Sequence, residues 1–180
     1  MNEYNNLIIY KQATLIYDLT YLFCSQYLNP MVEKRTIEQM QQAARSGKQN
    51  IVEGVLEKSS KLEINLLSVS RASFGELLED YKDYLRTRSL VVWDKEHPKL
   101  LALQSLKITD ENSVIMRWRE WTSEPERFAN LMITLLYKEM FMLDKFIAVL
   151  EKNFIETGGY SENLLKKRLN YRKNNPEFPI

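Results

Sequence analysis

The chain has 180 residues, 44% of them hydrophobic, which is enough for one domain with a sizeable core. Its five Gly and five Pro are few for an all-β protein. Because 25 Lys and Arg residues face 24 Asp and Glu residues, the net charge is only +1, and there is no overall basic field to drive nucleic-acid binding.

The single cysteine, Cys24, excludes an intrachain disulfide and fits a reducing compartment. The segment Met1–Asn6 is neither basic nor apolar, so it does not have the pattern of a signal peptide. The longest apolar runs fall far short of the ~20 residues that a membrane-spanning helix needs. We therefore expect a cytoplasmic protein with no membrane partner.

Apolar periodicity predicts a first helix over residues 7–28, ended by Asn29-Pro30. It carries two apolar stripes, which are Ile8, Leu15, Leu19, Leu22 and Tyr10, Tyr17, Tyr21, Cys24, Leu28. An offset of two positions is about 200° around a helix, so the stripes are expected on nearly opposite faces. The tyrosine stripe is then a subunit interface (Tyr10, Tyr17, Tyr21 and Leu28), a wet surface, or a surface covered by the C-terminal part of the chain.

A second helix is expected over residues 32–57 and a third over 61–88, with Ser59 or Ser60 as its N-cap. Small residues lie at regular positions on both, namely Ala44, Gly47 and Gly54, then Ser70, Ser73 and Gly75. A glycine inside a helix costs about 1 kcal/mol relative to alanine. Two glycines in the second helix therefore indicate that a neighbouring helix approaches its backbone closely.

Residues 89–124 predict a helical insertion, with a turn at 93–98 and short helices over 95–107 and 111–122. All three tryptophans lie in this segment. We interpret them as packing residues rather than as a ligand site, and whether the insertion forms a binding groove stays open.

A fourth long helix is expected over residues 125–157, with Pro125 in its first turn and Gly158-Gly159 as its stop. A short last helix follows, capped by Ser161 and ending near Lys173, and then an extended tail over 174–180. This last helix has five basic residues, Lys166, Lys167, Arg168, Arg172 and Lys173, against the single acid Glu162. The fold class is therefore all-α, with residues 1–157 as the main domain and 158–180 as a basic appendage.

Enzyme chemistry has few candidate residues. His97 is the only histidine, so a di-iron bundle with two Glu-x-x-His motifs and zinc sites of the Cys/His type cannot be built. No glycine-rich phosphate loop follows a strand. The carboxylates Glu76, Glu79 and Asp80 fit a solvated helix face. We predict no catalytic, cofactor-binding or metal-binding residues.

Two segments, Gln42–Gly54 and Ser68–Leu77, resemble the bacterial four-helix-bundle proteins called rRNA intervening-sequence proteins, also described as ribosomal-protein-like. The specific parts are an Asn-Ile-x-Glu-Gly box and a Ser-x-x-Glu motif, whose signature residues here are Asn50, Glu53, Gly54, Ser73 and Glu76. We interpret Asn50 and Glu53 as hydrogen-bonding to a neighbouring helix or subunit. A ligand or nucleic-acid contact is the alternative.

The ending 158–164, with Arg168 and Arg172 beyond it, and the insertion 93–121 resemble the "four helix bundle suffix" subgroup. The resemblance implies an antiparallel up-down-up-down four-helix bundle, with a helical insertion between helices three and four and a short C-terminal helix. Such proteins are similar to the accessory variability determinant of diversity-generating retroelements, a basic pentamer that works with nucleic acid. No catalytic residues are known for this family.

The sequence therefore leads to a non-enzymatic homo-oligomer, by resemblance a pentamer, that acts as an interaction scaffold. The alternative is an RNA- or DNA-binding accessory protein. Its contacts would be Lys166, Lys167, Arg168, Arg172 and Lys173, with Tyr160 and Tyr171 available for base stacking. A third possibility is a module that binds a protein partner in a groove near the tryptophans.

Overall fold

The computed structural model describes residues 3–94, 96–100 and 120–175. Its long helices are α1 (Ile8–Tyr27), α2 (Lys34–Leu56), α3 (Ser60–Thr87) and α6 (Pro125–Thr157), with a short η1 (Glu3–Asn6) before them and α7 (Tyr160–Asn174) after them. The described residues contain no strand, so the all-α prediction is confirmed. The four long helices lie within two residues of their predicted bounds. The predicted helices of the insertion fall mainly on residues 95 and 101–119, outside the described part of the chain.

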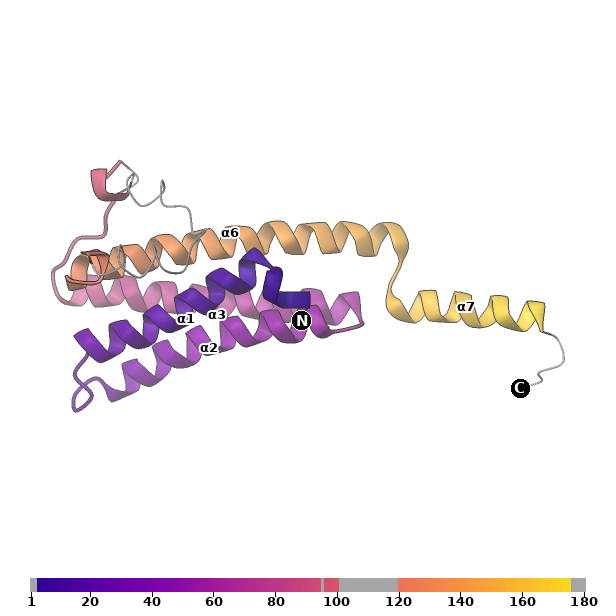
Figure 1. Cartoon of the computed structure of the whole chain (residues 1–180), viewed down its shortest axis with the longest axis horizontal. Helices are drawn as coiled ribbons and strands as arrows, with labels where there is room; N and C mark the ends of the chain where they lie inside the picture. The colour runs from indigo at the N-terminus through magenta and orange to yellow at the C-terminus, as the bar shows by residue number, and fades with distance from the viewer. Residues whose placement is uncertain (1–2, 95, 101–119, 176–180) are drawn as a thin grey trace.

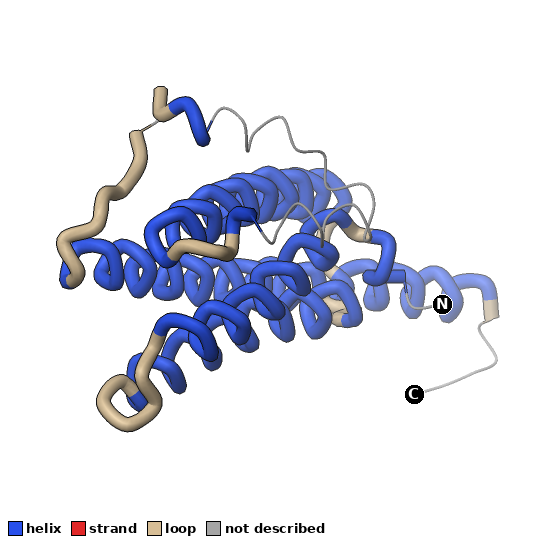
Figure 2. Tube along the Cα trace, turned by 60° about the vertical axis from the view of Figure 1, so that its left-hand side comes forward, coloured by secondary structure: helices blue, strands red, loops and turns tan. Residues whose placement is uncertain are grey.

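The four long helices lie side by side (Figures 1 and 2). Helix α1 packs against α2 and α6, and α3 also packs against α2 and α6, so each helix has two neighbours around a shared core. The largest side chains that are fully buried there include Phe23, Phe74, Tyr81 and Phe128. The ring of Phe23 lies 4.9 Å from that of Tyr81 and 5.3 Å from that of Phe128, which joins α1, α3 and α6.

The buried face of α1 differs from the sequence prediction. Its buried side chains are Ile9, Gln12, Ala13, Ile16, Leu19, Thr20, Phe23 and Cys24. Ile8 of the first predicted stripe is 69% exposed and Tyr21 of the second is 38% exposed. Ile9 lies about 100° from each of its neighbours around the helix, midway between the two stripes. The core therefore contacts the face between them, and each stripe forms a flank of α1.

Helices α2 and α3 approach each other as closely as their small residues predict. A Cβ atom on Gly47 would lie 2.5 Å from the ring of Phe74, and one on Gly54 would lie 3.4 Å from Cγ of Leu67. Ser70 Oγ donates a hydrogen bond of 2.7 Å to the carbonyl oxygen of Gly47. The absence of side chains at these glycines lets α3 pack directly on the backbone of α2.

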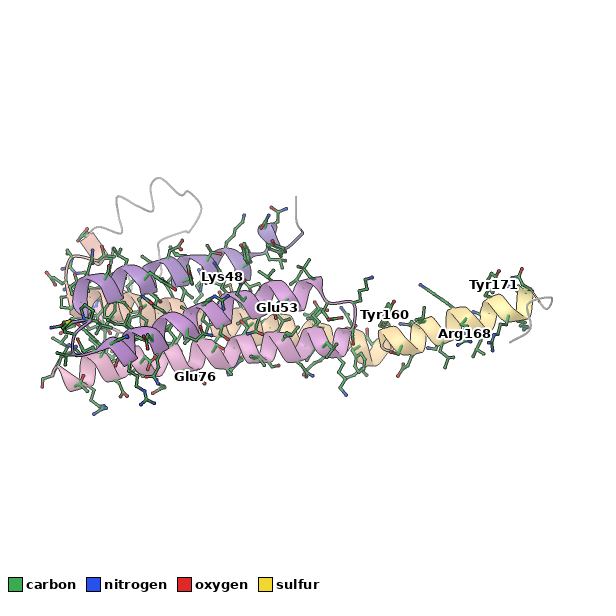
Figure 3. All side chains as sticks on the ribbon, turned by 90° about the horizontal axis from the view of Figure 1, so that it is seen from below. Lys48, Glu53, Glu76, Tyr160, Arg168 and Tyr171 are labelled. Carbon is green, nitrogen blue, oxygen red and sulfur yellow. The ribbon has the colours of Figure 1, made fainter. Side chains whose placement is uncertain are left out.

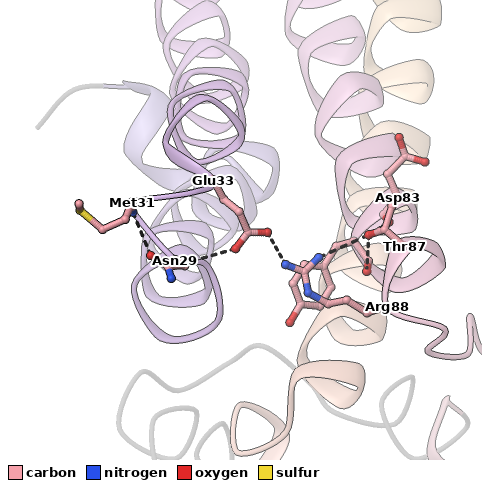
Figure 4. A network of polar contacts seen from close by, with 7 residues as sticks. Asn29, Met31, Glu33, Asp83, Thr87 and Arg88 are labelled. Carbon is pink, nitrogen blue, oxygen red and sulfur yellow. Dashed lines mark hydrogen bonds and ion pairs between the residues drawn. The ribbon is translucent and has the colours of Figure 1, made fainter.

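A polar network fastens the loop between α1 and α2 to the end of α3 (Figure 4). Asn29 N donates to Glu33 Oε2 over 2.8 Å, Met31 N donates to Asn29 Oδ1 over 2.9 Å, and Glu33 forms an ion pair with Arg88. Burial alone would raise the pKa of Glu33, but the hydrogen bond from Asn29 and the guanidinium of Arg88 outweigh it and lower that pKa. The Arg88 guanidinium also lies 3.9 Å from the centre of the Tyr84 ring.

Helix α7 projects beyond the end of α6, away from the other helices (Figure 1). Gly158, at φ 78°, ends α6 in a backbone conformation that favours glycine. Gly159 is the N-cap of α7, and its N–H donates to Glu162 Oε2 over 3.4 Å. The helix thus begins earlier than the predicted cap at Ser161. None of its residues is buried.

We expect the substitution Gly47→Ala to lower the free energy of unfolding by about 2 kcal/mol, because the new methyl group would overlap the Phe74 ring. The matched control is Gly75→Ala in α3, where the nearest atom to a new Cβ is Met140 Sδ at 4.0 Å. This control should instead gain about 0.5 to 1 kcal/mol from helix propensity. Chemical denaturation measures both. Equal effects would contradict the close approach at Gly47.

Candidate interaction surfaces

The surface of α7 combines basic and apolar side chains. Tyr160, Leu164, Leu165, Leu169 and Tyr171 are between 46% and 56% exposed. The five predicted cations lie on the same helix; Lys166, Lys167, Arg168 and Lys173 are exposed and Arg172 is half-buried. Tyr160, Arg168 and Tyr171 all project from the part of α7 that lies beyond the bundle (Figure 3). The residues predicted to contact nucleic acid are therefore brought together on one isolated helix.

The predicted tyrosine interface on α1 is only partly exposed. The rings of Tyr17 and Tyr21 lie 4.7 Å apart, and Lys48 Nζ of α2 lies 4.1 Å from the centre of the Tyr17 ring. Tyr10 is half-buried and contacts Tyr4 of η1, with ring centres 5.0 Å apart. Leu28 is only 5% exposed and belongs to the core of its own chain, so it does not contribute to this surface.

The signature residues divide into two groups. Asn50 Nδ2 donates to the carbonyl oxygen of Ser46 over 2.9 Å, and Ser46 Oγ is hydrogen-bonded to Ser73 Oγ of α3 over 2.9 Å. Among the described residues, Asn50 therefore bonds within α2, to the carbonyl and hydroxyl oxygens of Ser46, and not to a neighbouring helix as predicted. Ser73 and Gly54 lie directly at the contact between α2 and α3. Glu53 and Glu76 are exposed and face solvent, Glu53 from the last turn of α2 and Glu76 from nearer the middle of α3 (Figure 3).

An open groove of about 880 Å³ runs between α2 and α3. Its lining includes the acids Glu38, Glu76, Glu79 and Asp80 and the cation Arg35, over a floor of small residues such as Ala43. Burial raises the pKa of Asp80 to about 6, and the nearby carboxylates of Asp83 and Glu76 add to this effect. The acids of α3 were expected on a solvated face. The sequence alone did not indicate the groove, because Glu38 belongs to α2 and the other acids belong to α3. They line one groove only because these two helices pack against each other.

The tryptophans of the insertion that the structure describes are packing residues, as predicted. Trp93 is stacked on His97 with ring centres 4.4 Å apart, and the Trp121 ring centre lies 6.4 Å from that of Trp93. Trp93 N donates to Asn130 Oδ1 over 2.8 Å, and Trp93 Nε1 donates to Glu126 Oε1 over 3.2 Å. These contacts hold the chain after α3 against α6. Trp118 lies outside the described residues.

Two buried polar side chains lie at the contact between α1 and α6. Gln12 Nε2 donates to the carbonyl oxygen of Leu135 over 2.9 Å, one turn before Glu139 on α6. Gln12 Oε1 and both carboxyl oxygens of Glu139 are buried and have no hydrogen-bond partner among the described residues. Burial raises the pKa of Glu139 to about 9, although nearby Lys138 lowers it slightly, so the carboxyl is neutral at pH 7. The sequence pattern did not single out either residue.

Comparison with family models, with curated proteins and with solved structures gave no match for this chain. None of the helices described here is both long enough and apolar enough to cross a lipid bilayer. Among the described residues, no group of three or more His, Cys, Asp or Glu side chains has an arrangement that would hold a metal ion.

The buried carboxyl of Glu139 should make stability fall as pH rises. In the unfolded chain it ionises near pH 4.5, whereas in the folded chain it stays protonated to about pH 9, so each rise in pH between these values favours unfolding. Between about pH 6.5 and about pH 8.5, the free energy of unfolding should fall with pH in the wild type. In Glu139→Gln this fall should be smaller by about 1 kcal/mol per pH unit. Denaturant titrations at each pH measure this difference. Glu151→Gln, an exposed site on the same helix, should keep the wild-type slope.

Proposed function

We propose that this chain is a non-enzymatic, self-associating helical scaffold. The observation that carries the proposal is α7, a helix of 15 residues without a single buried side chain. Isolated helices of about this length are marginal in water, and most helices in proteins are stabilised by packing an apolar face. Helix α7 therefore needs a partner outside its own bundle.

The exposed leucines of α7 favour a protein surface as that partner. Leu164, Leu165 and Leu169 are each more than half exposed. Burying one leucine side chain contributes about 1.5 to 3 kcal/mol, which is enough for three of them to offset much of the entropic cost of association. The exposed part of the tyrosine surface, at Tyr17 and Tyr21, offers a second contact between copies.

We include in this proposal an antiparallel up-down-up-down arrangement of α1, α2, α3 and α6. Contacts in which residue numbers rise along one helix and fall along its neighbour support it. Examples are Gln12 with Leu135 and Tyr27 with Thr122 for α1 and α6, and Glu33 with Arg88 and Ser46 with Ser73 for α2 and α3. The proposal also includes three points that rest on the sequence. These are membership of the intervening-sequence family, a ring of five copies and a cytoplasmic location.

A specific observation favours RNA or DNA binding as a second candidate function. The five cations of α7 form no ion pair among the residues that the structure describes, and the aromatic rings of Tyr160 and Tyr171 are about half exposed on the same helix. Lysine and arginine neutralise phosphates, and exposed tyrosines stack on bases. A ring of copies would strengthen a weak site through avidity.

For self-association, we expect the full chain to sediment as an oligomer at micromolar concentration. The double substitution Leu164→Gln with Leu169→Gln should weaken the association constant by about a hundredfold, because two leucine side chains lose their burial. The control is Leu56→Gln, which changes a leucine that is also more than half exposed, at the end of α2, and should leave the assembly intact. A wild-type monomer would overturn the proposal.

For nucleic-acid binding, the test is fluorescence anisotropy with a single-stranded RNA oligonucleotide. Five phosphate contacts should give a slope of about −3.5 in log affinity against log salt, which is about a hundredfold loss between about 50 and about 200 mM salt. Lys166→Gln with Lys167→Gln should make the slope shallower by about 1.4. Lys34→Gln with Lys58→Gln, at exposed sites on the bundle, is the control. Binding that ignores salt would rule this function out.

A further inference from the structure

We propose that α7 of one copy docks in the α2–α3 groove of a second copy, with Arg168 and Arg172 facing Glu76 and Asp80. The proposal rests on the self-association argued above and names the two surfaces that meet. The groove and α7 are separate surfaces of the same chain, one acidic and one basic.

Two carboxylates in the groove lack a cation of their own. Glu79 is paired with Lys82 over 2.8 Å, and Glu38 lies 3.9 Å from Lys34. Glu76 and Asp80 form no ion pair among the described residues. These two acids are therefore the ones that a basic partner would neutralise.

The cost of leaving these carboxylates unpaired is greatest at Asp80. Its side chain is half-buried, and its neighbours Glu76 and Asp83 are also acidic. This environment raises the pKa of Asp80 to about 6, which means that the charged form is disfavoured in the isolated chain. Arg35 is the only cation among the residues that line the groove. A guanidinium placed over Asp80 would favour its ionised form.

The basic residues of α7 have the matching spacing. Arg168 and Arg172 are four residues apart, as are Glu76 and Asp80, and four residues of α-helix rise about 6 Å. When α7 lies alongside α3, both arginines can therefore meet both carboxylates at once, in the charge-assisted pairs that arginine forms best. Leu164 and Leu165 lie on either side of the two arginines within about 60° around the helix and would contact the groove with them.

The distances along the helices exclude docking of α7 in the groove of its own chain. Gly75, beside Glu76, lies against Met140 of α6, and Met140 is 18 residues before Gly158. Glu76 is therefore about 27 Å back along α6 from the point where α7 begins. If α7 folded back, Arg168 would reach only about 14 Å from Gly159. The occupant of the groove must come from a second copy.

This contact is heterologous, because the surface given by one copy differs from the surface it offers to the next. Each copy in a docked pair keeps one free groove or one free α7. Such a contact closes at a dimer only where two copies exchange their α7 helices reciprocally, and otherwise continues until a larger ring closes or a filament grows. The proposed interface therefore accounts for assembly beyond two copies without any additional surface.

The experiment uses charge reversal in the full-length chain and measures molar mass by sedimentation. One variant carries Arg168→Glu and Arg172→Glu, and the other carries Glu76→Lys and Asp80→Lys. Each alone should weaken association by at least about a hundredfold. An equimolar mixture should restore association as an alternating assembly, with an even number of copies wherever a ring closes. The reversed helix of the first variant then meets the reversed groove of the second, and the unchanged helix of the second meets the unchanged groove of the first.

Two controls separate the interface from general effects. Lys166→Glu with Lys173→Glu makes the same change in net charge on α7, at positions about 100° to 160° around the helix from the arginines, and should keep the assembly. Thermal unfolding by circular dichroism checks the groove variant, whereas the α7 substitutions lie outside the packed bundle.

The outcomes are distinct. Reversed variants that assemble like the wild type, or a mixture that fails to recover, would overturn the docking while leaving self-association in place. A wild-type chain that is monomeric throughout would overturn both proposals. If the arginine variant kept its assembly but lost RNA binding, α7 would belong to a nucleic-acid site and the docking would be wrong.

Discussion

The close contact of α2 with α3 is the constraint on which the rest of the molecule depends. With only a hydrogen atom as the side chain of Gly47, the Phe74 ring lies on the backbone of α2, and Ser70 is close enough to donate to the Gly47 carbonyl oxygen. This separation fixes how the helices are turned relative to each other. Side chains at the centre of the contact are small, and the longer acidic side chains beside it form the walls of the groove. The opposite side of α3 is left for α6, with which it encloses the aromatic core.

The sequence predicts well the features that depend on one helix at a time. Pro30, Pro125 and Gly158 mark the boundaries of helices, and the structure places those boundaries close to the predicted positions. The small residues of α2 likewise indicate that another helix packs closely against it, but they do not show which helix. The buried face of α1 was assigned wrongly, because two flanking stripes gave a stronger periodic signal than the mixed face between them, which includes Gln12 and Thr20. Gln12 is accommodated on that face by the carbonyl oxygen of Leu135 on α6, which lies far away in the sequence. The Thr20 hydroxyl donates to Ile16 of its own helix and accepts from the distant Tyr81 of α3.

The distribution of charge is a second feature that the sequence does not show without the packing of the helices. A net charge of +1 argues against a basic protein, yet it conceals a basic helix at one end and an acidic groove near the other. The two regions cancel in the total, although they lie on separate parts of the structure. Acids on α2 and α3 come together only through the register of those helices, and that register is set by contacts such as Ser46 with Ser73. Composition therefore describes the average field, whereas the local fields determine which surfaces attract each other.

The lone cysteine in the core has a practical consequence. Cys24 lies on the buried face of α1 and is only 2% exposed. Burial, with a further effect from the charge of Asp80, raises the pKa of its thiol to about 12. Since the thiolate is the reactive form of cysteine, this side chain is protected from alkylation and oxidation as long as the chain is folded. Two folded copies cannot be joined through it, so an assembly of native chains is held together by noncovalent contacts whether or not a reductant is present, and labelling by a thiol reagent reports unfolding.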